Sequence, residues 1–283
     1  MKQVLVISGK GGTGKTFFTG CLAVAVKNKV LVDCDVDAAN LHLLLHPEIK
    51  ESYEFIGGKL AQIDKTKCIE CGLCIENCKF NAIGENFQVD ELSCEGCTIC
   101  SYICPQEAII LRDRVSGQYF ISETKYGTLI HARLGIAQEN SGKLVTKLRE
   151  HAKELANAKS CQYIIIDGPP GVGCPVMASM TGVDIVVAVT EPTLSGMHDL
   201  GRVIELAKHF KIPLKVIVNK FDLNPQMSEK IEEELGKFEI ELAGRIPFSE
   251  EILYSVKKGF PFLEFSQGKL SKEIESLIQN IFS

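Results

Sequence analysis

The chain is 283 residues long, with 45% hydrophobic and 24% charged residues and a formal net charge of -5. This is ordinary globular composition with enough apolar material for one large α/β domain carrying a small insertion, or for two small domains. The acidic balance excludes general nucleic-acid binding, and no apolar stretch is long enough to cross a bilayer or to serve as an export signal, so we expect a cytoplasmic protein.

The apolar patterns along the chain are typical of an α/β domain that is interrupted by a different kind of segment. Before residue 60 we expect a buried strand at 2–8, a helix at 15–27 and a strand at 30–32. From about Leu60 to Arg112 the pattern gives way to short turns with cysteines between them. Beyond it we expect a hairpin of strands 118–123 and 128–133, further strands at 163–166, 185–189 and 214–218, and helices at 143–158, 196–210, 226–236, 249–258 and 269–282. The predicted domains are a nucleotide-binding domain in two parts, 1–59 and 113–283, and an inserted domain at 60–112.

A glycine-rich octapeptide follows the first strand: Gly9-Lys10-Gly11-Gly12-Thr13-Gly14-Lys15-Thr16. It satisfies G-x4-GK[ST], the loop whose backbone N–H groups hold phosphates at the N-terminus of the next helix. In such a loop Lys15 reaches the β- and γ-phosphates and the Thr16 hydroxyl binds Mg²⁺. Asp167 ends the hydrophobic strand 163–166, where phosphoryl chemistry needs a Mg²⁺-organising carboxylate.

The same glycines also satisfy G-x-G-x-x-G, a dinucleotide fingerprint, with Asp33 and Asp35 about 20 residues further on. A dinucleotide site has no use for a lysine and a hydroxyl directed at a terminal phosphate and a metal ion. Lys15 and Thr16 therefore favour the phosphate loop. The expected fold class is α/β: a mostly parallel P-loop NTPase sheet with helices on both faces.

Eight of the twelve cysteines form two runs with the same spacing, C-x2-C-x2-C-x3-C. This is the ligand pattern of a bacterial-type two-cluster ferredoxin, in which the fourth cysteine of each run binds the other run's cluster. We therefore expect an inserted ferredoxin domain with two [4Fe-4S] clusters. One would be held by Cys68, Cys71, Cys74 and Cys104, and the other by Cys94, Cys97, Cys100 and Cys78.

Zinc binding and disulfide formation are two alternative uses of these cysteines. Zinc also binds Cx2C pairs, but a zinc site normally takes its ligands from two separated pairs. A disulfide framework is disfavoured because the cysteines are closely spaced in a chain with no export signal. The first run departs from the full motif, because Lys79 follows it where the second run has Pro105.

Together these motifs resemble those of the MinD/ParA/Mrp group of P-loop ATPases, which includes the nitrogenase iron protein. More narrowly, they resemble MinD-type ATPases with an inserted ferredoxin domain. The ATPase resemblance covers 1–59 and roughly 140–283, and the ferredoxin resemblance covers 60–112. Its most specific mark is Lys10, the second, signature lysine of the group's KGGxGK[ST] loop. The resemblance implies that Lys10 crosses the interface of an ATP-sandwich dimer to the partner's phosphates.

The resemblance also implies roles for other positions. Asp35 matches the switch I aspartate that positions or activates the attacking water, and Asp33 would lie near Mg²⁺. The segment Asp167–Gly171 resembles switch II, D-x-P-P-G, in which a backbone N–H senses the γ-phosphate. Asn219 matches the residue that reads adenine, and Pro247 lies in the later loop that flanks the base.

The remaining cysteines and the last helix were considered separately. Cys21, Cys34 and Cys161 are expected to be buried or incidental. Cys174 falls seven residues after Asp167, the offset of a switch II cluster ligand in the nitrogenase iron protein; the stronger expectation is a buried cysteine packed behind switch II. Helix 269–282 has one apolar face and balanced lysines and glutamates, which favours core packing over a membrane anchor.

These observations support two classes of function. The first is a slow, Mg²⁺-dependent ATPase, with ATP/ADP, Mg²⁺ and two [4Fe-4S] clusters as cofactors, that couples nucleotide-driven dimerisation to electron transfer or metallocluster assembly. The alternative is a MinD/ParA-like positioning or assembly ATPase whose clusters are structural or sense redox state. A simple dinucleotide oxidoreductase is a third, weaker hypothesis.

The partners expected from the sequence follow from the same features. The ATPase resemblance implies a homodimer or a dimer with a paralogous ATPase. Residues 60–112 hold eight acidic and four basic side chains, so a redox or metalloprotein partner would present a basic docking face. We expect no nucleic-acid partner and no stable membrane anchor.

Overall fold

The structure is a computed structural model, and it describes residues 1–135 and 141–282. The chain divides into two compact units. The α/β unit comprises residues 1–52, 119–133 and 141–282, and the cysteine unit comprises residues 53–118 with 134–135. The boundaries 60 and 112 that we predict for the insertion stay a prediction.

Within the described residues, nine strands form one sheet in the order β3-β4-β5-β2-β6-β1-β7-β8-β9. The strands are β1 (Lys2–Ser8), β2 (Lys29–Asp33), β3 (Glu48–Ile63), β4 (Ile109–Thr124), β5 (Gly127–Leu134), β6 (Tyr163–Pro170), β7 (Ile185–Thr190), β8 (Leu214–Asn219) and β9 (Glu241–Ile246). The helices are α1 (Lys15–Ala25), α2 (Leu41–Leu45), α3 (Leu73–Glu76), α4 (Ile99–Ile103), α5 (Ser141–Ala158), α6 (Cys174–Met180), α7 (Leu194–Phe210), α8 (Pro225–Lys237), α9 (Glu250–Lys257), α10 (Phe262–Phe265) and α11 (Lys269–Phe282), with a 3₁₀ turn η1 (Phe221–Leu223).

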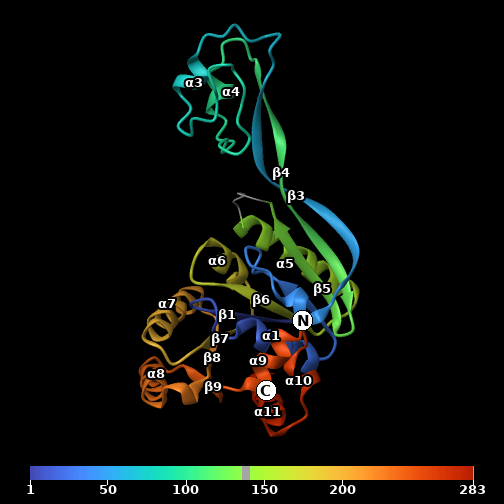
Figure 1. Cartoon of the computed structure of the whole chain (residues 1–283), viewed down its shortest axis with the longest axis vertical. Helices are drawn as coiled ribbons and strands as arrows, with labels where there is room; N and C mark the ends of the chain where they lie inside the picture. Colours follow the sequence, from blue (N-terminus) through green and yellow to red (C-terminus); the bar gives the residue numbers. More distant parts are fainter. Residues whose placement is uncertain (136–140, 283) are drawn as a thin grey trace. The chain divides into compact units, whose positions relative to one another are not determined.

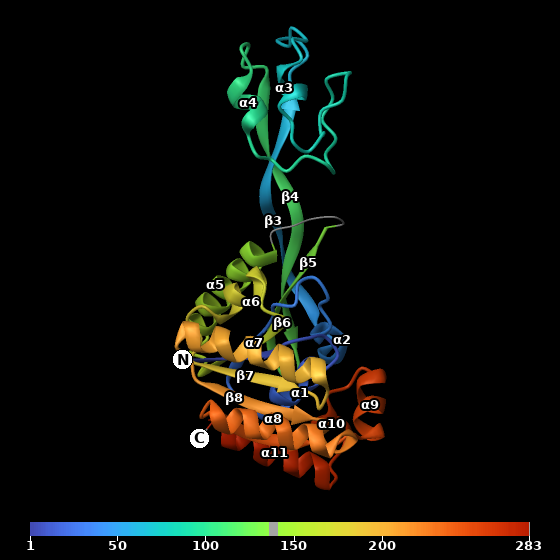
Figure 2. The same ribbon diagram turned by 90° about the vertical axis from the view of Figure 1, so that its left-hand side faces the viewer.

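The strands from β5 to β9 along this order pair in parallel. The two central strands, β1 and β6, are almost entirely buried, because helices cover both faces of the sheet. Figures 1 and 2 show α5, α6 and α7 on one face of the α/β unit and α1, α10 and α11 on the other. A mostly parallel α/β sheet with helices on both faces is therefore confirmed.

The main core lies on the face covered by α1, α2 and α9 to α11. Phe18 and Leu22 of α1 and Phe262 of α10 are fully buried there against Val4 and Val6 of β1. The last helix adds a buried apolar stripe that consists of Ile274, Leu277, Ile278 and Ile281. Core packing of helix 269–282 is therefore confirmed, and no helix in the described part of the chain is long and apolar enough to cross a membrane.

The strands and helices predicted for the α/β unit are all present, but the sequence analysis missed the length of β3 and β4. We expected short turns from Leu60 onward, whereas β3 continues to Ile63 and β4 already begins at Ile109. Much of β3 is exposed on both sides, so it has no regular alternation of apolar and polar residues. The short elements α2, α6, β9 and α10 were also missed.

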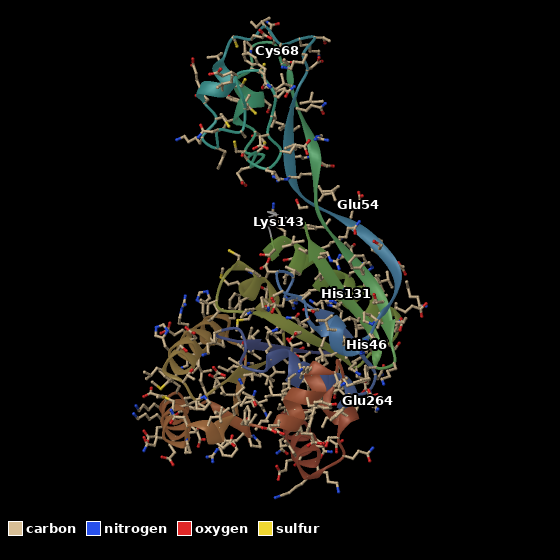
Figure 3. The ribbon with its side chains drawn as sticks, in the orientation of Figure 1. His46, Glu54, Cys68, His131, Lys143 and Glu264 are labelled. Carbon is tan, nitrogen blue, oxygen red and sulfur yellow. The ribbon has the colours of Figure 1, made fainter. Side chains whose placement is uncertain are left out.

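The cysteine unit has a small core of its own. Its buried residues are Leu60, Ala61, Cys74, Ala82, Ile83, Cys94 and Ile109. The helices α3 and α4 have four and five residues, and an isolated antiparallel bridge joins Ile83 to Val89. Figure 3 labels Cys68, the first cysteine of the two runs, in this unit.

Candidate functional site: a phosphate loop and two cysteine cavities

The predicted phosphate loop connects β1 to α1. Gly12 and Gly14 have φ angles of +80° and +99°, a left-handed conformation that favours glycine. Gly14 is also the N-terminal cap of α1, and a Cβ atom there would collide with the side chain of Asn219. The octapeptide therefore folds as its glycines require, with Lys15 as the first residue of the helix.

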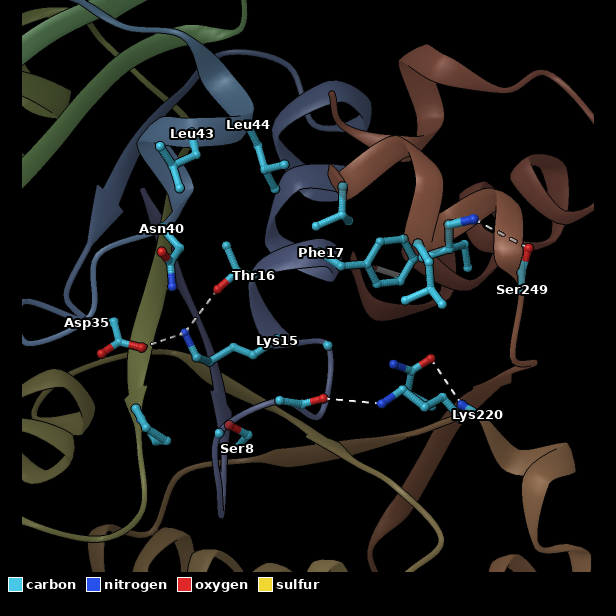
Figure 4. Close-up of a pocket in the computed structure, with 18 of the residues that line it drawn as sticks. Ser8, Lys15, Thr16, Phe17, Asp35, Asn40, Leu43, Leu44, Lys220 and Ser249 are labelled. Atoms are coloured by element: carbon cyan, nitrogen blue, oxygen red, sulfur yellow. Dashed lines mark hydrogen bonds and ion pairs between the residues drawn. The ribbon is translucent and has the colours of Figure 1, made fainter. Parts of the chain in front are cut away.

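Lys15 lies between two carboxylates at the start of this helix. Its Nζ is 3.1 Å from Asp167 Oδ1 and 3.3 Å from Asp35 Oδ2, and Figure 4 shows the second of these contacts. Burial alone would lower the pKa of Lys15, but the nearby carboxylates, Asp167 first, outweigh it and raise the pKa. Lys15 is therefore a buried cation with two anionic partners in its own chain.

Two aspartates meet beneath the phosphate loop at the ends of adjacent strands. Asp33 of β2 is in register with Asp167 of β6, and both are completely buried. Asp167 accepts hydrogen bonds from Thr16 Oγ1 at 2.9 Å and from Thr19 Oγ1 at 2.8 Å. Burial first, and then the charge of Asp167, raise the pKa of Asp33 to about 8. The positive charge of Lys15 lowers the pKa of Asp33, but by less than burial and Asp167 raise it.

Asp35 follows Asp33 by two residues, just beyond the end of β2. Its backbone N–H donates to Asp33 Oδ1 at 3.1 Å, and the N–H of Leu41 donates to Asp33 Oδ2 at 3.1 Å. Burial raises the pKa of Asp35, whereas the ion pair with Lys15 lowers it less. Asp33 thus holds the backbone at Asp35 and Leu41, and Asp35 lies beside Lys15.

A cavity of about 500 Å³ opens above the phosphate loop. Predicted site residues line its polar part: Gly11, Gly12, Gly14, Lys15, Thr16, Asp35, Asn219 and Pro247. Gly9, Lys10, Thr13, Asp33 and Asp167 do not line it. The Asn219 side chain donates from Nδ2 to the Thr13 carbonyl at 2.8 Å, so the predicted base-reading residue also holds the loop.

The other wall of this cavity was not predicted. It is apolar and consists of Phe17, Leu43, Leu44, Ile252, Leu253 and Val256, which come from α1, α2 and α9 (Figure 4). Asp222 fixes the edge of this wall, because its Oδ1 accepts a hydrogen bond from the N–H of Phe248 at 2.6 Å. The apolar residues of the short helix α2 were visible in the sequence, but nothing local indicated that they face a ligand.

Lys10, the predicted signature lysine, bonds within its own subunit. Its Nζ lies 2.8 Å from Glu191 Oε1 and donates to Ser195 Oγ at 2.9 Å and to Thr193 Oγ1 at 3.1 Å. The other Glu191 oxygen pairs with Lys220 Nζ at 3.0 Å. None of these three acceptors was singled out from the sequence, because they lie more than 180 residues from Lys10.

The eight cysteines of the two runs surround two small cavities in the cysteine unit. One is lined by Cys78, Cys94, Cys97 and Cys100, and the other by Cys68, Cys71, Cys74 and Cys104. These are the two crossed groups that the motif predicts. Among the described residues, no three His, Cys, Asp or Glu side chains are grouped closely enough to hold a single metal ion.

The backbone repeats itself around the two cavities. The residue that directly follows the second cysteine of each run, Gly72 or Thr98, has a φ of +82° or +70°. The fourth cysteines match as well, because Cys78 Sγ accepts a hydrogen bond from Ala82 N and Cys104 Sγ accepts one from Ala108 N, both at 3.3 Å. The two runs are thus one local structure used twice.

The four cysteines outside the runs differ in exposure. Cys21 and Cys34 are fully buried, as expected, and Cys161 is half-buried. Cys174 corrects our expectation of a buried residue behind switch II, because it is exposed at the first position of α6. The helix begins there, so the residue that follows switch II in sequence points away from the packed face.

Comparison with known proteins identifies the family. The profile described as the CobQ/CobB/MinD/ParA nucleotide binding domain matches residues 4–262. The chain belongs to this family. It is an ATP-binding P-loop ATPase of the MinD/ParA type, with the phosphate loop and the sheet that this family requires.

Individual relatives agree with this assignment. The MinD/ParA-like ATPase is 37% identical over 226 residues to an uncharacterized protein of Methanocaldococcus jannaschii, covering 78% of this chain and 79% of that protein. It is 26% identical over 290 residues to the septum site-determining protein MinD of Thermotoga maritima, covering 98% and 87%. The fold matches that of MinD from Pyrococcus horikoshii complexed with Mg-ADP, with a TM-score of 0.61 and 17% identity over 99% of this chain and 95% of that one.

Proposed function

We propose that this protein is a nucleotide-driven assembly or positioning ATPase that closes into a dimer, of identical chains or with a paralogous ATPase, around ATP and Mg²⁺. The main observation in support of this proposal is the position of Lys15. Its ammonium group lies between the carboxylates of Asp167 and Asp35 at the polar end of the cavity. The phosphate oxygens of a bound nucleotide would replace the aspartate carboxylates as anionic partners of Lys15. Lys15 would then release Asp35, whose carboxylate becomes available to position the attacking water.

The donor set beneath the loop fits Mg²⁺, which prefers hard oxygen ligands. The Thr16 hydroxyl and the carboxylates of Asp33 and Asp167 would hold the ion directly or through water. The buried pair Asp33 and Asp167 supports this assignment, because a cation would offset both the burial of Asp33 and the charge of Asp167, which together raise the pKa of Asp33. When bound, Mg²⁺ neutralises charge on the β- and γ-phosphate oxygens. The Mg-ADP in the Pyrococcus horikoshii MinD structure supports the same choice of ion.

The proposal is tested by hydrolysis and dimerisation measured together. We expect slow, Mg²⁺-dependent ATP hydrolysis, and dimers in analytical ultracentrifugation only with a non-hydrolysable ATP analogue. Lys10→Ala should still bind nucleotide as a monomer but lose dimerisation and turnover, because its ammonium would no longer reach the partner's phosphates. Lys269→Ala, an exposed lysine on α11, serves as the control. Normal hydrolysis by the Lys10→Ala variant would falsify the sandwich dimer.

A second candidate function, ATP-gated electron transfer or metallocluster assembly, rests on the two cysteine cavities. Four thiols surround each cavity, which fits a cubane whose four irons each take one cysteine. The N–H groups of Ala82 and Ala108 would stabilise the thiolates of Cys78 and Cys104. Bound clusters would supply one-electron chemistry, and the acidic surface of residues 60–112 would suit a partner with a basic docking face.

Two measurements separate the candidates. Anaerobic reconstitution with iron and sulfide should give about eight irons per chain in two four-iron clusters; bound zinc without sulfide would exclude the ferredoxin assignment. Redox titration with the ATP analogue and with ADP should then give different reduction potentials if nucleotide gates electron transfer. Equal potentials and equal oxidation rates in both states would leave the clusters structural or redox-sensing and the assembly ATPase as the function.

A further inference from the structure

The signature lysine is fully bonded inside its own subunit. Lys10 Nζ has three acceptors, Glu191 Oε1, Ser195 Oγ and Thr193 Oγ1, at 2.8, 2.9 and 3.1 Å. An ammonium has three N–H donors, so none is left over for another ligand. The side chains of Lys10 and Glu191 are only 28% and 17% exposed, so water screens this pair less than a pair on the open surface.

Glu191 also reaches the nucleotide cavity through its second oxygen. Glu191 Oε2 lies 3.0 Å from Lys220 Nζ, which also donates to the Gly12 carbonyl at 3.3 Å. Lys220 lines the cavity beside Asn219. One carboxylate therefore connects the signature lysine with the edge of the site that is expected to receive the base.

The backbone that carries this carboxylate is rigid. Glu191 follows directly on β7, and Thr193 caps α7 by accepting a hydrogen bond from Gly196 N at 2.9 Å. Gly196 packs so closely on the Glu191 carbonyl that a Cβ atom would not fit. A Cβ on Gly9 would lie 2.5 Å from Asp199 Cβ, so the phosphate loop also sits tightly on α7. The flexible side chain of Lys10 is the part that can move.

We infer that Glu191 is a positioning residue that holds Lys10 within its own subunit, and that Lys10 must leave Glu191 before it can reach a partner's phosphates. This inference rests on the proposed sandwich dimer. The ion pair between Glu191 and Lys10 therefore lowers the fraction of subunits that can dimerise. A partly exposed ion pair favours the held state by about fivefold. This leaves about one sixth of the subunits with Lys10 released, and because both subunits must release it, the dimer dissociation constant should be raised by about 36-fold.

The test is Glu191→Gln, which keeps the size of the side chain and removes its charge. We expect the dissociation constant of the dimer with the ATP analogue to fall by about 36-fold in analytical ultracentrifugation. A residue with a merely structural role would give the opposite result, because its loss weakens packing and assembly. Lys220→Gln is the matched control: it breaks the other ion pair of Glu191 but leaves the pair with Lys10, so dimerisation should not tighten. Unchanged or weaker dimerisation of Glu191→Gln overturns the inference.

A second readout works in the monomer and separates this inference from the proposed function. Trace acylation of lysines, read by mass spectrometry without nucleotide, should modify Lys10 severalfold faster in Glu191→Gln than in the natural chain, relative to exposed Lys269. Equal labelling overturns the hold on Lys10. Faster labelling in a chain that stays monomeric with saturating ATP analogue supports the hold and overturns the sandwich dimer.

Discussion

The α/β unit and the cysteine unit bury different kinds of material. The α/β unit packs large aliphatic and aromatic side chains, and Phe18, Leu31 and Phe262 are completely buried in it. The cysteine unit has a core of a few small or medium side chains, and the expected cluster ligands Cys74 and Cys94 are among them. A domain with a core this small normally needs a bound metal or disulfide bonds to be stable. The comparison predicts that the α/β unit is stable by itself and that the stability of the cysteine unit depends on the clusters proposed for it.

The two units also start their helices differently. In the α/β unit, Thr193, Asn224 and Ser249 accept hydrogen bonds from backbone N–H groups at the starts of α7, α8 and α9. In the cysteine unit, α3 and α4 begin at Gly72 and Thr98, where the described structure has no side-chain cap and φ is positive. The α/β unit thus has side-chain caps on three of its longer helices, although α1 begins at Gly14, which has a positive φ and no side-chain cap like the helices of the cysteine unit.

The largest effect is expected from removing iron. Chelation of the reconstituted protein should abolish hydrogen-exchange protection in residues 60–108 and leave nucleotide binding by the α/β unit intact, because binding and folding are coupled only in the cysteine unit. Cys97→Ser should lose one cluster preferentially, whereas Cys161→Ser, outside both runs, should retain both. Full protection of residues 60–108 after chelation would mean that the small core suffices.

The next effect concerns the α/β unit alone. Lys15→Ala should weaken binding of the ATP analogue by about 100-fold, or about 2.7 kcal/mol, because a charge-assisted contact to the phosphates is lost while the buried carboxylates remain. Isothermal titration calorimetry with Mg²⁺ measures this, with Lys269→Ala as the control. Iron content should not change. An equal loss of iron would show that the two units do not behave independently.

A pH effect should also be confined to the α/β unit. Burial, and then the neighbouring His42 and Arg133, lower the pKa of His131 to about 4, and its Nε2 lies 3.0 Å from Ser122 Oγ (Figure 3). The unfolded chain binds a proton near pH 6.5 and the folded chain does not, so this contribution to stability is present above pH 6.5 and is lost as the pH falls toward 4. The loss should approach about 3 kcal/mol.

Denaturant unfolding between pH 7 and pH 4 tests this, comparing the natural chain with His131→Gln. The variant lacks the titrating ring, so its stability should fall less steeply over this range. Parallel pH profiles for the two proteins would mean that the ring of His131 accepts a proton without cost in the folded state.

The smallest effects have opposite signs in the two units. Thr98→Gly should stabilise the cysteine unit by about 1 kcal/mol, because a β-branched residue is strained at a positive φ and Gly72 already occupies the equivalent position of the first run. Asn224→Ala should destabilise the α/β unit by about 1 kcal/mol through loss of its cap on α8. Resistance of the iron clusters to chelation measures the effect of Thr98→Gly, and thermal unfolding measures the effect of Asn224→Ala. Destabilisation by Thr98→Gly would mean that contacts of the Thr98 side chain outweigh the strain of its positive φ.

Local patterns were sufficient to predict the central strands, the longer helices and the phosphate loop, but not β3 or β9 at the two ends of the strand order. The apolar runs of β1, β6 and β7 are long and continuous because these strands are covered on both faces. β3 gave no such signal, because it is largely exposed. Cys174 was misplaced because its offset from Asp167 says nothing about which way the first residue of α6 faces.

The sequence by itself predicted the phosphate loop and the two crossed groups of cysteines, because glycines and cysteines at fixed spacing restrict the backbone turns that carry them. Tertiary structure alone decided which charges meet. Lys15 pairs with Asp167 and Lys10 with Glu191, and each partner comes from a distant strand end. Tertiary structure also decided that α2 and α9 form the apolar wall of the cavity. Such contacts leave no periodic trace in the sequence, because they depend on how parallel strands bring remote segments to one edge of the sheet.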